Sequence, residues 1–262
     1  MKFVLGGLTV IALALILTGV PYLFPAEWWL AATTATTAMA DISLTLGALL
    51  AALAFGRGDP LRRAWLWVTA SGFTGLVSTL SQGPNLRSVS NHLIETQSGL
   101  VVGGVIDVVL NLTMIIGFLL FARAWAQTGL APPGQRAATL VATCVGLAVA
   151  GPSLWHDIVR ALEGTKGGIG SSISDIGDIV AIALAGPLFA SALWMRGGDL
   201  VGPYIYLTTS VAAWLVYDAG SLFALEGSRN FFDMLTTTTA TLFAALAGLT
   251  HYWVIRKAPQ RR

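Results

Sequence analysis

Residues 3–24 read FVLGGLTVIALALILTGVPYLF, a stretch that contains no charged side chain. A helix rises ~1.5 Å per residue, so about 20 apolar residues cross the ~30 Å hydrocarbon core of a bilayer. Seven further segments are predominantly apolar and long enough to do the same: 28–55, 62–82, 99–123, 137–158, 174–195, 202–223 and 232–255. The pattern predicts an all-α, polytopic membrane protein with eight transmembrane helices.

Composition agrees with this prediction. The chain has 262 residues, of which 55% are hydrophobic and 11% charged, and its mean hydropathy is +0.73. Ordinary soluble domains contain roughly 25% charged residues, so this chain has too few to cover a water-exposed surface. A formal net charge of +2 provides no basic face for nucleic acid. The single cysteine, Cys144, excludes a disulfide framework and a thiolate metal site.

The positions of Lys and Arg predict the orientation of the spans. If the N-terminus lies inside, 11 of the 15 basic residues fall on the cytoplasmic side. Arg87, Arg160, Lys166 and Arg229 fall outside. This positive-inside asymmetry predicts a multi-pass protein of the bacterial inner (plasma) membrane with both termini cytoplasmic.

The two halves of the chain resemble each other. Residues 64–71 read AWLWVTAS and residues 203–210 read PYIYLTTS, and nine identities are found around them at the same offset of 139. The identities predict a tandem repeat, 1–130 and 131–262, with four helices in each half. Because each half has an even number of spans, the repeats are expected to be parallel. Chance similarity between apolar helices remains the alternative.

Polar residues inside the spans are the candidate functional residues, because a charged side chain in the bilayer centre costs ~2.5–3.5 kcal/mol on insertion scales. Asp41 lies near the middle of its span, and no Lys or Arg is expected at the depth of the acids. Polar stripes at helical spacing should face the interior of the bundle, which predicts an acidic, outward-opening crevice between the halves. The candidate ligand- or ion-binding residues are Asp41, Asp107, Asn111, Asp218, Asp233 and Thr237.

Structural explanations compete with a binding role for these residues. Asp175, Asp178 and Asp233 stand close to the predicted starts of their helices, where carboxylates cap free N–H groups. Asp107 and Asp218 are as well explained by interfacial solvation or by hydrogen bonds between helices. Threonine hydroxyls in membrane helices commonly bond back to their own helix.

No catalytic or cofactor-binding motif accompanies the acids. His92, His156 and His251 are expected at different depths, which argues against a haem held by two histidines and against a three-histidine metal site. Ser153 and His156 share one helix turn without any motif of nucleophilic catalysis. The sequence therefore predicts no cofactor and no metal site, and it does not support an enzymatic function. Tryptophans near span ends, Trp65 among them, are expected to form interfacial belts, and the histidines are expected at interfaces as well.

One segment carries a family resemblance. The run SDIGDIVAIALAGPL at 174–188, the pair RG at 196–197 and the span with Trp214 and Asp218 resemble the multi-pass sensory modules that precede bacterial signalling kinases and cyclases. Such modules normally carry a cytoplasmic output domain, whereas only a short basic tail follows the last span here. The resemblance implies a stand-alone or partner-dependent protein and assigns no residue a role.

Two functional classes remain open. The first is a non-catalytic membrane protein, sensor-like or an accessory subunit, that binds a small ligand or a partner protein within the membrane. The second is a transporter or channel for a cation, a proton or an amine-bearing solute through the acidic crevice. The expected partners are the lipid bilayer, a membrane protein or a second copy of the chain, and a small cationic ligand.

Overall fold

The computed structural model describes residues 2–81, 97–127, 134–163, 168–195, 198–223 and 229–257. In these ranges the chain forms eight long helices and one short 3₁₀ helix, and no strand. They are α1 (Lys2–Gly19), η1 (Val20–Leu23), α2 (Ala26–Ala54), α3 (Pro60–Ser81), α5 (Gln97–Gln127), α6 (Gln135–Leu162), α7 (Gly168–Trp194), α8 (Val201–Phe223) and α9 (Arg229–Lys257). Each of the eight predicted apolar segments is a long helix, which confirms the all-α class and the helix count.

Proline and aspartate set several helix boundaries. Pro21 lies near the start of η1, and α2 begins directly after Pro25. The α3 helix begins at Pro60, where the missing N–H is not needed. Asp59 caps this helix, because its side-chain Oδ1 accepts a hydrogen bond of 2.8 Å from the Leu61 backbone N–H. The two breaks that separate α1, α2 and α3 are therefore real turns.

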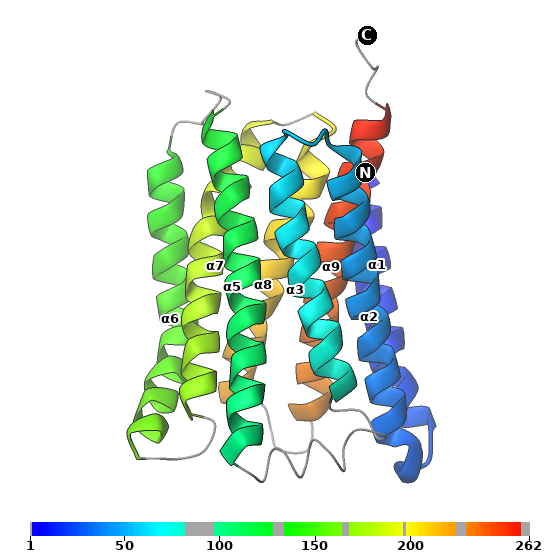
Figure 1. Cartoon of the computed structure of the whole chain (residues 1–262), viewed down its shortest axis with the longest axis vertical. Coiled ribbons are helices and arrows are strands. Elements are labelled where there is room, and N and C mark those ends of the chain that lie inside the picture. The colour runs from blue at the N-terminus through cyan, green and yellow to red at the C-terminus, as the bar shows by residue number, and fades with distance from the viewer. Residues whose placement is uncertain are drawn as a thin grey trace.

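Six of the helices form a closed ring. Each helix packs against the next in the order α2, α3, α5, α7, α8 and α9, and α9 packs against α2 to close the ring. The remaining two long helices lie outside the ring: α1 packs on α9, and α6 packs on α7 and α8 (Figure 1). The chain begins α1 and completes α9 at the same end of the bundle (Figure 1). We call this the N/C end and the opposite one the far end.

Small residues let α2 and α9 approach closely. A Cβ atom added at Gly47 would lie only 2.6 Å from the carbonyl oxygen of Ala245, so only glycine fits this contact. Ala48 on α2 and Ala244 and Ala247 on α9 are also buried. Close backbone approach supplies the van der Waals contact that drives helix association in lipid, where no hydrophobic effect acts between helices.

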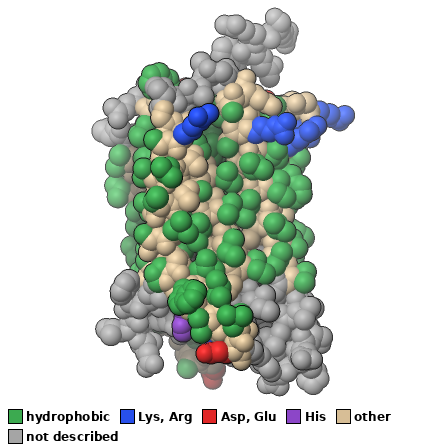
Figure 2. Space-filling model, turned by 90° about the vertical axis from the view of Figure 1, so that its left-hand side faces the viewer, with side chains coloured by type: hydrophobic (Ala, Val, Ile, Leu, Met, Phe, Trp, Pro, Cys, Tyr) green, Lys and Arg blue, Asp and Glu red, His purple; other side chains and the backbone are tan. Residues whose placement is uncertain are grey.

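The outside of the bundle is apolar. Leu5, Leu53, Leu140 and Val141 are among the many large hydrophobic side chains that are more than half exposed. On the face shown in Figure 2, hydrophobic side chains cover the middle, Lys and Arg gather at the N/C end, and acidic and histidine side chains lie towards the far end. This distribution is typical of a protein surrounded by a bilayer.

Length and composition make six described helical segments candidates for crossing a membrane. They are Phe3–Leu23, Ala26–Ala54, Val108–Gln127, Gln135–Leu162, Ser172–Trp194 and Phe231–Lys257. The chain therefore has the properties of a polytopic membrane protein. The α3 and α8 helices, of 22 and 23 residues, are not among the six, although each lies between two helices that are.

Candidate functional site

The ring of six helices, together with α6, lines a polar cavity of about 910 Å³. It extends from Arg160 and Asp157, near the far end of α6, to Leu44, Phe118 and Ala244, about halfway along the bundle. The Arg160 side chain is 39% exposed and marks the mouth. The polar lining residues are Asp41, Ser71, Asn111, Ser153, His156, Asp157, Arg160, Ser174, Asp175, Asp178, Ser210, Tyr217, Thr237 and Thr241.

Asp41 stands on one wall of the cavity, at the middle of α2. Its side chain is 8% exposed, and its Oδ2 accepts a hydrogen bond of 2.7 Å from the Thr79 hydroxyl of α3. Gly75, one turn before Thr79, packs against the carboxylate, since a Cβ atom there would lie 3.4 Å from Asp41 Oδ1, an ordinary van der Waals distance. The donor at Thr79 therefore orients this carboxylate at the cavity wall.

Asp175 and Asp178 lie on α7, on the opposite side of the ring from α2. The Asp175 side chain is only 6% exposed. The Ser153 hydroxyl of α6 is within hydrogen-bonding reach of its carboxylate, yet Asp175 Oδ2 has no hydrogen-bond partner among the described residues. A buried acceptor without a partner costs free energy, so this oxygen is suited to receive a donor from a bound molecule.

The α6 helix adds a polar stripe near the mouth of the cavity. Ser153, His156, Asp157 and Arg160 follow one another at helical spacing and all line the cavity. The Arg160 Nη1 atom lies 3.4 Å from Asp157 Oδ1, a long ion pair along one helix. Asp157 also lies close enough to Asp175 for the two negative charges to interact. The expectation that no base lies at the depth of the acids is therefore wrong for Arg160, because α6 continues to Leu162.

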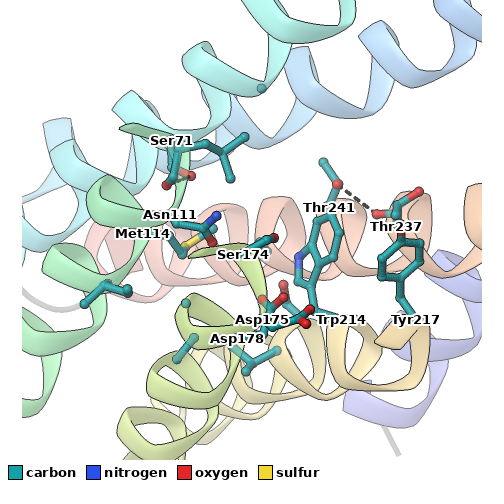
Figure 3. Close-up of a pocket in the computed structure, with 18 of the residues that line it drawn as sticks. Ser71, Asn111, Met114, Ser174, Asp175, Asp178, Trp214, Tyr217, Thr237 and Thr241 are labelled. Atoms are coloured by element: carbon teal, nitrogen blue, oxygen red, sulfur yellow. Dashed lines mark hydrogen bonds between the residues drawn. The ribbon is translucent and has the colours of Figure 1, made fainter. Parts of the chain in front are cut away.

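Aromatic side chains form part of the wall next to the α7 carboxylates. Trp214 and Tyr217 lie one turn apart on α8, with ring centroids 6.0 Å apart and planes at 80°. In Figure 3 the Trp214 ring lies between the α7 carboxylates and Tyr217. Rings of this kind can hold a cation or an apolar group beside the carboxylates.

The cavity ends at a buried aromatic cluster on the N/C side. Trp65 Nε1 donates a hydrogen bond of 3.0 Å to His251 Nδ1, and the two side chains are 1% and 0% exposed. Edge-to-face ring contacts join His251 to Phe55 and Tyr204, and Trp65 to Phe121. Four of the rings come from α3, α5, α8 and α9, and Phe55 directly follows α2, so four of the six ring helices contribute to the closure. The expected interfacial positions of Trp65 and His251 are wrong, because each supplies the hydrogen-bond partner that the other needs when buried.

The hydrogen bond from Trp65 determines the protonation of His251. An indole nitrogen can only donate, so His251 Nδ1 must accept and the neutral ring carries its proton on Nε2. His251 Nε2 is buried and has no hydrogen-bond partner among the described residues. A protonated nitrogen cannot ligate a metal, so His251 is not available as a ligand while this bond holds.

Three of the six candidate binding residues line the cavity: Asp41, Asn111 and Thr237. Asn111 on α5 packs against Gly177 of α7, while the Thr237 hydroxyl bonds to the carbonyl oxygen of Asp233 in its own helix. Asp233, one turn before Thr237, is not among the lining residues. The side chains of Asp107 and Asp218 lie outside the described part of the structure, although their backbones belong to α5 and α8.

The capping interpretation of the outer acids is wrong. The α7 helix starts at Gly168 and α9 starts at Arg229, and neither has an acidic residue in its first turn. Asp175, Asp178 and Asp233 lie further inside, because both helices extend beyond the predicted spans at the far end. The back-bonding explanation is confirmed for many threonines, including Thr34, Thr236 and Thr239, whose hydroxyls bond to carbonyl oxygens one turn earlier.

The donor set favours recognition of a cation by carboxylates and rings over metal chemistry. Four carboxylates, on α2, α6 and α7, line the cavity together with one guanidinium. Among the described residues no group of three or more His, Cys, Asp or Glu is placed to hold a metal ion. Comparison of the chain with protein families, curated proteins and solved structures finds no match.

Proposed function

We propose that this chain is a non-catalytic, multi-pass protein of the bacterial inner membrane that binds a small cationic solute within the membrane. The observation that carries the proposal is the excess of negative charge in an enclosed cavity: Asp41, Asp157, Asp175 and Asp178 against Arg160. Intramembrane carboxylates are costly and usually functional. Low-dielectric walls strengthen their attraction for a cation.

We propose that the N/C end is cytoplasmic, so that the cavity faces the outside. The support is the gathering of Lys and Arg at the N/C end of the face in Figure 2, as the positive-inside rule requires. A solute would then reach Asp175 and Asp178 from the periplasm or the medium. Access from this side fits a sensor-like protein that binds an external ligand.

We propose further that the chain is a parallel duplication of 1–130 and 131–262. In this proposal α2, α3 and α5 correspond to α7, α8 and α9. The order of contacts supports it, since exchanging the two sets turns the α2–α9 contact into the α7–α5 contact and leaves the ring unchanged. The outer helices depart from the symmetry, because α6 packs on α7 while α1 packs mainly on α9. The correspondence of α3 with α8 also supports a full crossing for both, since each lies between two apolar helices of the ring.

The closure of the cavity on its N/C side favours a receptor over an open channel. The Trp65–His251 cluster fills the ring on the N/C side of the cavity, so a solute that enters has no continuous path across. A transporter remains the second candidate, because an outward-facing transporter also presents a cavity with one closed end. A receptor also needs a membrane-protein partner or a second copy of the chain to pass its signal on, and we propose such a partner here.

Binding and flux measurements separate the two functions. We expect the purified protein in nanodiscs to be stabilised thermally by small organic or inorganic cations and not by anions. Asp41→Asn should weaken this stabilisation, whereas Asp199→Asn, an exposed acid between α7 and α8, should not. Binding without cation flux in proteoliposomes supports the receptor, and flux that Asp41→Asn abolishes supports the transporter. Failure of every cation to bind would exclude both.

A further inference from the structure

We propose that the bound solute is an organic ammonium whose nitrogen is held by Asp175 and whose apolar body lies against Trp214 and Tyr217; this inference rests on the cation-binding function proposed above. Three features of the cavity carry it. They are an unsatisfied buried carboxylate oxygen, a pair of aromatic rings beside it, and a volume too large for a bare ion.

The oxygen belongs to Asp175. The side chain is 6% exposed, and its Oδ2 has no hydrogen-bond partner among the described residues. The Ser153 hydroxyl serves the same carboxylate, and Asp157 beside it adds negative charge. The site therefore offers a buried acceptor and a favourable field for a cation that can donate. An ammonium N–H group supplies both the donor and the charge, whereas a neutral alcohol supplies only the donor.

The rings belong to the neighbouring helix. Trp214 and Tyr217 of α8 pack edge to face at 6.0 Å and line the cavity with Asp175 (Figure 3). Since α7 and α8 are in contact, the rings and the carboxylate belong to one wall of the cavity. Aromatic faces attract alkylammonium groups and also bury the hydrocarbon attached to them. Carboxylate and rings together select a cation that has an apolar body.

The size of the cavity agrees with an organic solute. At about 910 Å³ it falls in the range of pockets that enclose whole organic molecules. Asp41 stands on the wall opposite Asp175, and among the described residues no three carboxylates are placed to hold one small ion. Gathered oxygens are what a small inorganic cation requires. A solute with hydrocarbon groups fills the space that an ion leaves empty.

Calorimetric titration of the full chain in nanodiscs tests the inference with four probes. Phenethylammonium has both a positive charge and an apolar aromatic body. Methylammonium and K⁺ have the charge without that body, and 2-phenylethanol has the aromatic body without the charge. Empty nanodiscs correct for partition into lipid. The variants are Asp175→Asn and Trp214→Leu, and their matched controls are Asp199→Asn and Trp194→Leu, at exposed positions outside the cavity.

We expect phenethylammonium to bind at least tenfold more tightly than the other three probes. Asp175→Asn and Trp214→Leu should each weaken it at least tenfold, and both controls should bind as the unchanged protein does. Equal binding of methylammonium or K⁺ would overturn the organic-ammonium inference and leave the cation-binding function in place. Equal binding of 2-phenylethanol, or binding of no probe, would overturn both. If Asp175→Asn does not fold, Trp214→Leu alone decides between these outcomes.

Discussion

Trp65 on α3 donates its indole N–H to Nδ1 of His251 on α9, at 3.0 Å, and both side chains are almost completely buried. The two residues are 186 positions apart in the sequence. In the proposed duplication they belong to different halves, so this bond links the halves at the N/C end. The bond also belongs to the aromatic cluster that closes the cavity on the N/C side. The proposal of a receptor depends on this closure.

The first prediction concerns this bond. Trp65→Phe removes the donor and leaves His251 Nδ1 buried without a partner, which should lower the free energy of unfolding by about 1–3 kcal/mol. Trp253→Phe is the control, because Trp253 is 58% exposed on the outside of α9. Thermal unfolding in detergent measures both variants. Equal melting temperatures for the two would show that the bond contributes nothing.

The second prediction concerns the contact between α2 and α9. Gly47→Ala places a methyl group against the backbone oxygen of Ala245, which cannot rotate away as a side chain could. We expect a loss of about 1–3 kcal/mol, the usual cost of overpacking. Gly151→Ala in α6 meets no atom within 4 Å and should be neutral or slightly stabilising. The same unfolding assay compares them, and a stable Gly47→Ala protein would contradict the close approach.

The third prediction concerns the carboxylate of Asp41. Thr79→Val removes the 2.7 Å hydrogen bond to Asp41 Oδ2, and a hydrogen bond to a charged group contributes about 1.5–3 kcal/mol. Thr79→Ser keeps the donor and should retain most of the stability. Thr74→Val is the matched control on the same helix, because the Thr74 hydroxyl bonds only to the Ala70 carbonyl oxygen. If both valine variants unfold at the same temperature, the Asp41–Thr79 bond has no special role.

The fourth prediction concerns topology. In a Cys144→Ser background, Glu163→Cys at the far end should react with a membrane-impermeant maleimide added outside intact cells. Lys257→Cys at the N/C end should react only after the cells are opened. The reverse pattern would contradict the proposed orientation and would turn the cavity towards the cytoplasm.

Hydropathy predicted the eight helices well, because lipid requires long apolar segments with internally satisfied backbones. It predicted Asp41 as a lining residue for a related reason, since a carboxylate at mid-span must face the interior. It missed Asp157 and Arg160 of α6, which lie just inside the helix end. The spacing of Ser153, His156, Asp157 and Arg160 is the signal that could have found them, because it places four polar side chains on one face.

Other features depend on distant parts of the chain. The burial of Trp65 and His251 follows from their pairing across 186 residues, which no local pattern contains. The position of Asp175 inside the cavity follows from the start of α7 at Gly168, several residues before its apolar run begins. Helix ends of this kind are set by packing against neighbours rather than by hydropathy. The local sequence therefore contained nothing that argued against the capping interpretation.

The central claim is that the ring encloses an outward-facing cavity that is closed on the N/C side and attracts cations. Thr241→Cys places a thiol in the cavity, and Ala247→Cys, one turn before His251 on the same helix, places one at a fully buried position on the N/C side of the cavity. In the Cys144→Ser background, we measure their reaction rates with cationic and anionic methanethiosulfonates added outside sealed cells. Thr241→Cys should react at least tenfold faster with the cationic reagent, and Ala247→Cys should react with neither. Equal rates for the two reagents at Thr241→Cys, or no reaction there, would contradict the account.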